Sequence, residues 1–202
     1  MTALLLSGGM DSIALLYWKR PDIAFTIDYG QKAAQAEIRT SAYLCEQLDI
    51  PHHVMRIDCS PLGSGDMSNT DSHPLAPQTD WWPYRNQMLL TFAAMYLIKH
   101  QVSKIMIGSV QSDQQFQDGT NQFIKLINDL IIFQEGNIMI EAPAINMSTL
   151  ELIQQSKIPA SLLLSAHSCH TGNIACGRCR GCQKYAYIID RLQNTSALAT
   201  LE

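Results

Sequence analysis

Short apolar runs alternate with longer amphipathic stretches along most of the chain. The short runs end at glycine or at a turn, which is typical of strands buried on both faces of a parallel sheet. These candidate strands are 2–6, 23–27, 53–57, 104–107 and 138–141. The longer stretches have the apolar spacing of helices. These candidate helices are 11–19, 33–48, 87–100, 121–133 and one that begins at 150–155.

Strands separated by helices predict an α/β fold with a mainly parallel sheet and right-handed crossovers. We expect one α/β domain over residues 1–165 and a small appendage over 166–202, which ends in a helix around 185–192. The stretch 59–83 is rich in Ser, Asp, Pro and Gly. We expect it to be a long loop, and long loops in compact domains often cover a functional site.

Composition excludes several classes of protein. The chain has 202 residues, of which 47% are hydrophobic and 16% are charged, so it can bury a core and is not a disordered tail. Its 14 basic and 18 acidic residues give a net charge of −4, which argues against general nucleic-acid binding. We find no apolar run long enough for a membrane span and no basic start of a signal peptide, and therefore expect a cytoplasmic protein.

The sharpest motif near the start is Ser7-Gly8-Gly9-Met10-Asp11-Ser12, between the first strand and the first helix. Two glycines let backbone N–H groups approach an anion, and the helix adds the positive end of its dipole. Ser7 and Ser12 can donate hydroxyl hydrogen bonds to phosphate, while Asp11 can cap the helix or position a metal-bound pyrophosphate. The string is neither a Walker loop nor a dinucleotide fingerprint. A plain Gly-Gly turn with a serine cap is the alternative.

A second motif is a cluster of cysteines near the end of the chain. Four of the six cysteines form a C-x6-C-x2-C-x2-C pattern, and they are Cys169, Cys176, Cys179 and Cys182. Four thiolates suit a tetrahedral structural Zn²⁺ site, and an iron–sulfur cluster is the competing interpretation. His167 and His170 flank the first cysteine, and we expect them to be neighbours of the site rather than ligands.

The phosphate turn resembles that of the PP-loop ATPases, which are adenine nucleotide α hydrolase-like proteins with a Rossmann-like fold. Turn and cysteines together make the sequence similar to the 7-cyano-7-deazaguanine synthase (QueC) family over nearly the whole chain. Four further segments carry this resemblance. They are Asp28-Tyr29-Gly30-Gln31 followed by Glu37, Pro83-Tyr84-Arg85-Asn86, Gly108 with Asp113 and Phe116-Gln117-Asp118, and Ser168-Cys169-His170.

The resemblance implies a reaction and its cofactors. In this family, ATP activates the carboxylate of 7-carboxy-7-deazaguanine as an acyl adenylate, ammonia gives the amide, and a second activation gives the nitrile. ATP, Mg²⁺ and Zn²⁺ are the implied cofactors, and a homodimer is the implied assembly. The apolar helix at 87–97 could serve either the core or that interface.

The resemblance also assigns roles to residues. Arg85 would anchor phosphate or carboxylate, and Asp113 and Asp118 would read or position the deazaguanine. The implied catalytic residues are Asp11, Ser12, Arg85, Asp113 and Asp118. The implied nucleotide-binding residues are Leu6, Ser7, Gly8, Gly9, Met10, Asp11, Ser12, Asp28, Gln31, Arg85, Asn86 and Gly108.

The chain departs from the family at several cationic positions. Thr120 stands where the family usually has an arginine, and Thr149 where it usually has a lysine that neutralises phosphate. Lys184-Tyr185 replaces the usual arginine after the last cysteine. Lys157 or Lys125 is a candidate substitute for the missing lysine.

Three alternatives remain open. A QueC-like enzyme of the antiphage type would stop at the amide and conjugate the deazaguanine to a protein amine. A non-catalytic partner would only bind a nucleotide or nucleobase. A tRNA-thiolating enzyme would need a reactive cysteine, such as Cys45 or Cys59, and a basic RNA face.

Overall fold

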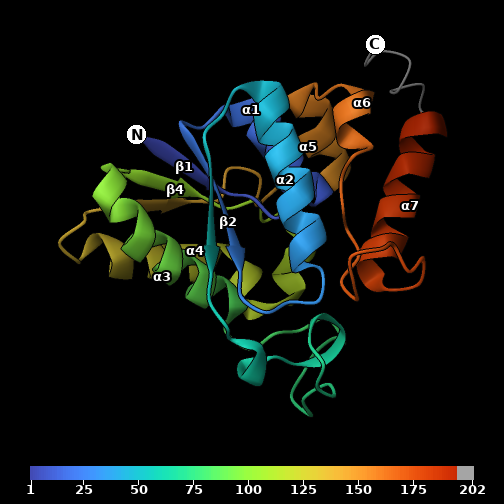
Figure 1. Ribbon diagram of the computed structural model, residues 1–202, viewed down its shortest axis with the longest axis horizontal. Helices are drawn as coiled ribbons and strands as arrows, with labels where there is room; N and C mark the ends of the chain where they lie inside the picture. Colours follow the sequence, from blue (N-terminus) through green and yellow to red (C-terminus); the bar gives the residue numbers. More distant parts are fainter. Residues whose placement is uncertain (195–202) are drawn as a thin grey trace.

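A computed structural model describes residues 1–194 of the chain, and its elements follow the predicted alternation of strands and helices (Figure 1). Residues 195–202 of the predicted appendage lie outside the described part. The strands are β1 (Thr2–Leu5), β2 (Ile23–Asp28), β3 (His52–Arg56), β4 (Lys104–Met106) and β5 (Met139–Glu141). The α-helices are α1 (Met10–Lys19), α2 (Ala34–Leu48), α3 (Arg85–Leu97), α4 (Asn121–Ile132), α5 (Thr149–Ser156), α6 (Ala160–Leu163) and α7 (Arg180–Asn194).

The five strands form one sheet in the order β3-β2-β1-β4-β5, and every neighbouring pair is parallel. The chain therefore winds outward from β1 in one direction and then returns to β4 on the other side of β1. This reversal makes the carboxyl ends of β1 and β4 the switch point of the sheet, where open α/β sheets bind their ligands. The predicted α/β fold with a parallel sheet is confirmed.

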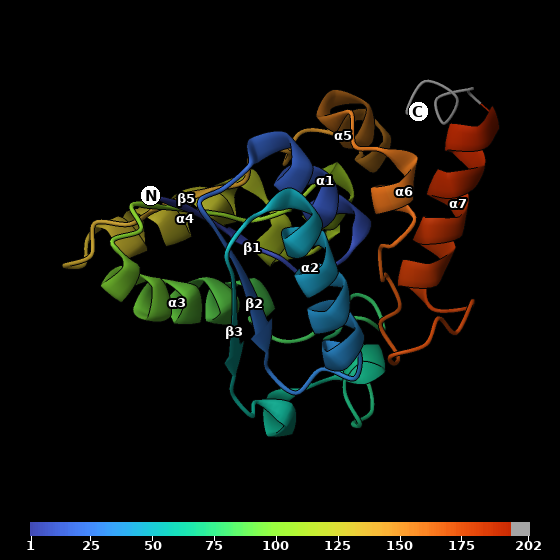
Figure 2. The same ribbon diagram turned by 45° about the horizontal axis from the view of Figure 1, so that its top comes forward.

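Alternate residues of the strands pack on opposite faces of the sheet. Leu5 and Phe25 face α3 and α4, which contribute Leu90 and Ile127 among others to that core. Leu4 and Leu6 face the other layer, which is built from α1, α2, α5 and α7. Figure 2 shows the two layers on either side of the sheet. The inner strands β1 and β2 are buried on both faces, which explains their mainly apolar sequence, whereas the edge strand β3 is only half-buried and carries His52, His53 and Arg56.

The predicted strand bounds differ from the observed ones by a residue or two, and the helices differ more at their ends. The last helix, α7, begins at Arg180, before the predicted 185–192 stretch. Cys179 directly precedes this helix and Cys182 lies in its first turn. The first two of five short 3₁₀ turns interrupt the predicted loop after β3. The 3₁₀ turns are η1 (Ser60–Leu62), η2 (Gly65–Met67), η3 (Ile98–His100), η4 (Gln111–Gln115) and η5 (Gln117–Gly119). Within residues 1–194 no helix is long and apolar enough to cross a bilayer.

Candidate active site at the switch point of the sheet

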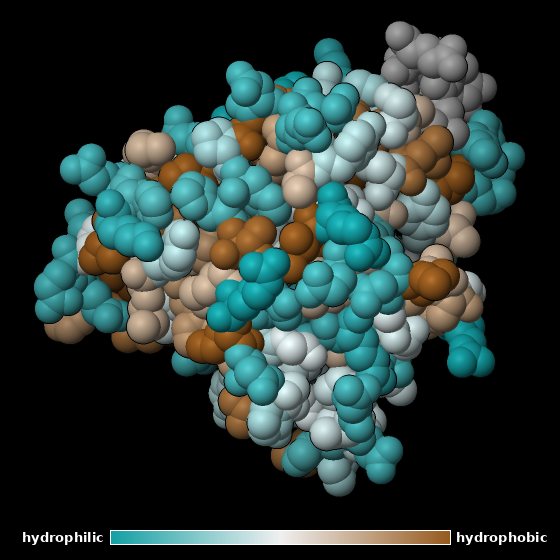
Figure 3. Space-filling view, in the orientation of Figure 1, coloured by the Kyte–Doolittle hydropathy of each residue, from teal (hydrophilic) through white to brown (hydrophobic). Residues whose placement is uncertain are grey.

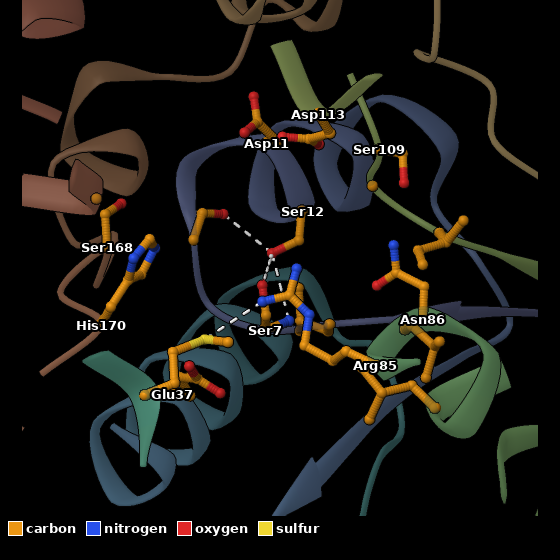
Figure 4. Close-up of a pocket in the computed structure, with 18 of the residues that line it drawn as sticks. Ser7, Asp11, Ser12, Glu37, Arg85, Asn86, Ser109, Asp113, Ser168 and His170 are labelled. Atoms are coloured by element: carbon orange, nitrogen blue, oxygen red, sulfur yellow. Dashed lines mark hydrogen bonds between the residues drawn. The ribbon is translucent and has the colours of Figure 1, made fainter. Parts of the chain in front are cut away.

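A cavity of about 270 Å³ opens at the carboxyl ends of the strands. Its walls come from the turn after β1, the segment after β4, the first turn of α3 and the cysteine-bearing segment (Figure 4). Apolar side chains of β1 and β2 form part of the lining, and charged side chains form much of the rest. This combination suits a ligand that has both a flat ring and an ionised group.

Most of the predicted site residues line this cavity. They are Leu6, Ser7, Gly9, Met10, Asp11, Ser12, Arg85, Asn86, Gly108, Asp113 and Asp118. Among the described residues, Gly8, Asp28 and Gln31 were predicted to bind the nucleotide and are not part of the lining.

The turn after β1 is held open by its serines and by a glycine. Ser12 Oγ donates to the carbonyl of Gly9 at 2.9 Å and accepts from Ser7 N at 3.3 Å. Gly8 adopts a φ of +71°, and a Cβ there would lie 3.1 Å from the carbonyl oxygen of Glu37. A side chain at Gly8 would therefore be strained in both conformation and space. The turn thus leads directly to the first N–H groups of α1, which suit an anion.

Gly108 brings the two sides of the switch point together. A Cβ at Gly108 would lie 3.1 Å from the Cα of Ser12, so a side chain there would crowd the packing of the segment after β4 against the start of α1. This contact explains why the sequence has glycine directly beyond the strand. The residue shapes the cavity through its backbone.

Asp11 is clasped by two side chains from distant parts of the chain. Thr149 Oγ1 donates to Asp11 Oδ1 at 2.7 Å, and Lys184 Nζ donates to Asp11 Oδ2 at 2.8 Å. Thr149 is the first residue of α5, and Lys184 lies in the second turn of α7. Lys184 therefore places a cation beside the phosphate turn from the opposite end of the sequence.

Lys184, rather than the two lysines that we considered, occupies the position of a compensating cation. Among the described residues, Lys184 is the lysine that lines the cavity, and Lys125 and Lys157 do not. Thr120 instead caps α4, where its Oγ1 accepts from Phe123 N at 3.2 Å. Thr149 stands at the position of the family lysine and contacts Asp11. Lys184 contacts the same carboxylate, so its ammonium group lies close to the place where that lysine is expected.

Asp113 lies close to Asp11 at the same end of the cavity (Figure 4). Burial raises the pKa of Asp113, Lys184 lowers it in part, and Asp11 raises it further. Its Oδ2 accepts from Val110 N at 3.0 Å, so one oxygen already holds its own loop. Two neighbouring carboxylates suit a divalent cation bound to phosphates, and Asp11 and Asp113 would hold Mg²⁺ there.

Arg85 projects into the middle of the cavity from the first turn of α3 (Figure 4). Burial works against its charge, but Tyr29 and three nearby carboxylates outweigh this effect and raise its pKa. Those carboxylates are Asp118, Asp113 and Asp80. Its Nη1 lies 3.3 Å from Met67 Sδ, so the guanidinium retains donors for an anionic ligand.

Asp118 and Asn86 fix the start of α3. Asp118 Oδ2 accepts from Asn86 N at 3.0 Å, and Asn86 Nδ2 donates to the carbonyl of Asp118 at 2.8 Å. The pair satisfies an N–H group at the start of the helix and joins α3 to η5. Both residues line the cavity, but these bonds give Asp118 a structural task in addition to its predicted role.

Gln31 and Asp28 hold the segment after β2. Gln31 is buried, accepts from Tyr29 N at 2.8 Å, and donates to Glu37 Oε2 at 2.8 Å. Asp28 accepts from Gly30 N and Gln35 Nε2. Glu37 lines the cavity itself, and burial raises its pKa to about 7. The D-Y-G-Q…E segment therefore presents Glu37 to the cavity, with Gln31 as its support.

Several residues that line the cavity have no signal in the sequence motifs. Asp80 comes from the long loop after β3, and it is only 6% exposed. Its Oδ2 lies 3.3 Å from His170 Nδ1 and 3.5 Å from Arg180 Nε. His170 and Arg180 both adjoin metal-site cysteines and both line the cavity. The adjacency of His170 to Cys169 was visible in the sequence, but no local pattern connects Asp80 to either residue.

The four cysteines come together as predicted. Their sulfur atoms all lie within 4.8 Å of one another, and the Cys176–Cys182 and Cys169–Cys179 sulfur pairs are 3.9 Å apart. Sulfurs bound at about 2.3 Å around one zinc ion lie about 3.8 Å apart, so the cluster fits a tetrahedral metal site. Backbone N–H groups also point at the sulfurs: His170 N lies 3.4 Å from Cys179 Sγ, and Cys179 N lies 3.3 Å from Cys176 Sγ.

The segment that bears the four cysteines, residues 167–184 and called the cysteine segment below, is attached directly to the phosphate turn. His167 N donates to the carbonyl of Gly8 at 2.9 Å, and Asn173 Oδ1 accepts from Ala36 N at 2.8 Å. Gly181 permits the close turn around the metal site, because a Cβ there would collide with the carbonyl of Ser168. A metal held by the cysteines would thereby fix one wall of the cavity.

Comparison with known proteins agrees with the motifs. The family model described as "Queuosine biosynthesis protein QueC" matches residues 2–187. The 7-cyano-7-deazaguanine synthase 1 of Desulfitobacterium hafniense is 30% identical over 192 residues, covering 89% of this chain and 86% of the relative. The 7-cyano-7-deazaguanine synthase of Methanosarcina barkeri is 28% identical over 208 residues, covering 90% of each.

A solved structure shares the fold. The NMN synthetase of Francisella tularensis superposes with a TM-score of 0.50 at 16% identity, covering 96% of this chain and 76% of that one. At this identity the similarity shows the arrangement of the sheet and helices alone.

Proposed function

The chain belongs to the QueC family of queuosine biosynthesis proteins, and from this premise we propose that it adenylates the carboxylate of 7-carboxy-7-deazaguanine and joins it to nitrogen. The observation that carries this proposal is the Ser7–Ser12 turn, which opens into a charged cavity at the switch point of the sheet. We place the reaction in the cytoplasm.

Activation replaces a poor leaving group with a good one. A carboxylate oxygen of the substrate attacks the α-phosphorus of ATP, a P–O bond breaks, and pyrophosphate leaves. The backbone N–H groups at the start of α1 and the hydroxyls of Ser7 and Ser12 would stabilise the charge on the departing phosphates. Mg²⁺ held by Asp11 and Asp113 would neutralise further phosphate charge.

Lys184 and Arg85 would supply the two fixed cations of the site. Lys184 contacts Asp11 at the phosphate end and lines the cavity, so its ammonium group would lie near the bound phosphates. Arg85 faces the middle of the cavity, where a planar guanidinium can hold a carboxylate or phosphate through two bonds. Together they would take over the charge neutralisation expected from the family positions that Thr149 and Thr120 occupy here.

The second step forms the C–N bond. The nitrogen lone pair attacks the acyl carbon, the bond to AMP breaks, and the nitrogen loses a proton. Glu37 is suitably placed to accept that proton, because it lines the cavity and burial raises its pKa to about 7. Ammonia as the nucleophile gives the amide. A second ATP then adenylates the amide oxygen with release of pyrophosphate, and loss of AMP and of the two protons on nitrogen gives the nitrile. A protein amine as the nucleophile would give a conjugate, as in the antiphage alternative.

The test is to incubate the purified, metal-loaded protein with ATP and 7-carboxy-7-deazaguanine, with and without ammonia. We expect AMP and pyrophosphate rather than ADP, and a new deazaguanine product by mass spectrometry. Its mass distinguishes amide, nitrile and protein adduct. Binding of ATP and base without AMP formation would refute the proposal in favour of the non-catalytic alternative.

A further inference from the structure

We propose that Asp80 reads the base: its carboxylate accepts the ring N–H and the exocyclic amino group of a guanine-type ring and so selects that ring from other purine-like bases. This inference rests on the proposed function, because it concerns the substrate of the same cavity. Nothing in the sequence motifs pointed to Asp80, which lies in the long loop between β3 and α3.

The first support is an acceptor that the protein leaves unused. Asp80 is only 6% exposed, and its Oδ1 has no hydrogen-bond partner among the described residues. A buried carboxylate oxygen without a donor is costly, so a ligand donor is the expected complement. The side chain lines the main cavity and also the small recess that lies beside it.

The second support is the contrast with the other two acids of this region. One oxygen of Asp113 accepts a hydrogen bond from Val110 N, and one oxygen of Asp118 accepts from Asn86 N. Both side chains therefore hold nearby backbone in place. Within residues 1–194, the Asp80 side chain accepts no hydrogen bond from the backbone. Its Oδ2 has only long contacts, at 3.3 Å to His170 and 3.5 Å to Arg180. Oδ1 is therefore open to a ligand donor, and Oδ2 keeps room for a second donor beside its two long contacts.

The charges around Asp80 favour a neutral donor over a cation. Arg180 already pairs with the carboxylate, and the charge of Arg85 also acts on it. An ammonium group at this place would be repelled by two guanidinium groups, whereas a neutral N–H edge carries no charge for them to repel. The amine substrate of the proposed reaction therefore does not belong at Asp80.

Aromatic side chains next to Asp80 suit a flat ring. Phe116 lines the main cavity together with Asp80, and the guanidinium of Arg180 lies 5.2 Å from the centre of the Phe116 ring. Trp82 is buried behind this wall, where its edge contact with Tyr29, with ring centres 4.9 Å apart, holds the segment that carries Asp80 in place. Flat bases stack on such aromatic or guanidinium planes while a polar group reads their edge.

The chemistry of the edge then specifies the ligand. A guanine-type ring presents a ring N–H and an exocyclic NH₂ side by side, which match the two oxygens of one carboxylate. An adenine-type ring offers an acceptor at the ring nitrogen, and a hypoxanthine-type ring lacks the amino group. Asp80 would therefore favour the guanine type over both.

The test exchanges the hydrogen-bond pattern at Asp80. Asp80→Asn keeps the size but presents one acceptor and one donor, which match the N–H and C=O edge of a xanthine-type ring. By calorimetry we expect Asp80→Asn to bind 7-deazaguanine about ten- to a hundredfold more weakly than the native protein and to gain affinity for 7-deazaxanthine. Asp71→Asn, in an exposed acid of the same loop, is the control that should change neither affinity.

Unchanged binding of 7-deazaguanine by Asp80→Asn would overturn the inference. If that variant fails to fold or to bind ATP, the native protein still decides the question: equal affinity for 7-deazaguanine and 7-deazahypoxanthine would overturn it, and a clear preference for the former would support it. Because these bases have no carboxylate, their binding is measured apart from AMP formation. A native protein that selects 7-deazaguanine but never makes AMP would refute the proposed reaction and leave the inference standing.

Discussion

Lys184 and Glu37 show how single side chains adapt this cavity. One brings a cation to the phosphate turn from the far end of the chain, and the other keeps a carboxyl group with a raised pKa in the wall. Neither role is visible in local sequence, because each depends on what the folded chain packs around the side chain.

Replacing Lys184 tests whether it carries phosphate charge. We expect Lys184→Ala to lower the rate of AMP formation about a hundredfold, since one fixed charge-stabilising donor is lost. Lys184→Arg should recover part of the rate. Lys157→Ala, at a lysine outside the cavity lining, is the matched control. Metal content is measured in each variant, because Lys184 lies two residues after Cys182. Full activity of metal-loaded Lys184→Ala would contradict the assignment.

Glu37 makes the stability of the protein depend on pH. Burial raises its pKa from an ordinary 4.5 to about 7, so between these values the folded state keeps a proton that the unfolded state has lost. The stabilising effect of that proton falls as the pH rises from about 4.5 through 7. We expect the Tm of the native protein to fall relative to that of Glu37→Gln over this range. A constant difference between the two Tm values would contradict the raised pKa.

At the scale of elements, the cysteine segment is a short loop whose shape depends on a metal. Its four sulfur atoms lie within 4.8 Å of one another. Three residues next to the cysteines line the cavity, so the shape of the segment sets their positions there; they are His170, Arg180 and Lys184. Loss of the metal should therefore disturb the wall of the cavity as well as the segment itself.

Replacing one cysteine tests the metal site. We expect the native protein to hold about one zinc ion per chain and Cys176→Ser to lose it. Because metal binding contributes to the folded state, the Tm should fall by roughly 10 °C. Cys45→Ser changes a buried cysteine outside the cluster and should keep the metal. Unchanged metal content in Cys176→Ser would refute the structural site, and iron instead of zinc would favour the iron–sulfur alternative.

The elements that the sequence predicted well are those with a strong local signal. The buried strands, the apolar spacing of α1 to α4, and the phosphate turn all follow from residues close together in the chain. The segment between β3 and α3 has no such period, so the burial of Asp80 could not be predicted. Similarly, α7 begins five residues before the predicted 185–192 stretch, because its first turn is polar and bears the last cysteine.

At the scale of the whole molecule, the layer formed by α3 and α4 keeps an exposed apolar surface. Met95 and Ile98 are 68% and 47% exposed, and Leu126, Leu130 and Phe133 of the α4 region are 60%, 52% and 88% exposed. Figure 3 shows apolar patches on the face that carries α3. The family resemblance implies a homodimer, and we propose that this surface is where two copies meet.

The oligomeric state tests this proposal. We expect a dimer by light scattering for the native protein and a monomer for Leu130→Glu, because a buried charge would oppose association. Leu75→Glu places the same change on an exposed loop and should leave the dimer intact. A native monomer, or a dimer that survives Leu130→Glu, would contradict the placement of the interface.

The attachment of the cysteine segment to the phosphate turn also bears on recombination. His170, Arg180 and Lys184 belong to the cavity and to the metal-bearing segment at once. In a chimera that takes this segment from a relative, the metal site and the cavity residues next to it would be exchanged together. Such an exchange would change the ligands that the cavity accepts and leave the parallel sheet as it is.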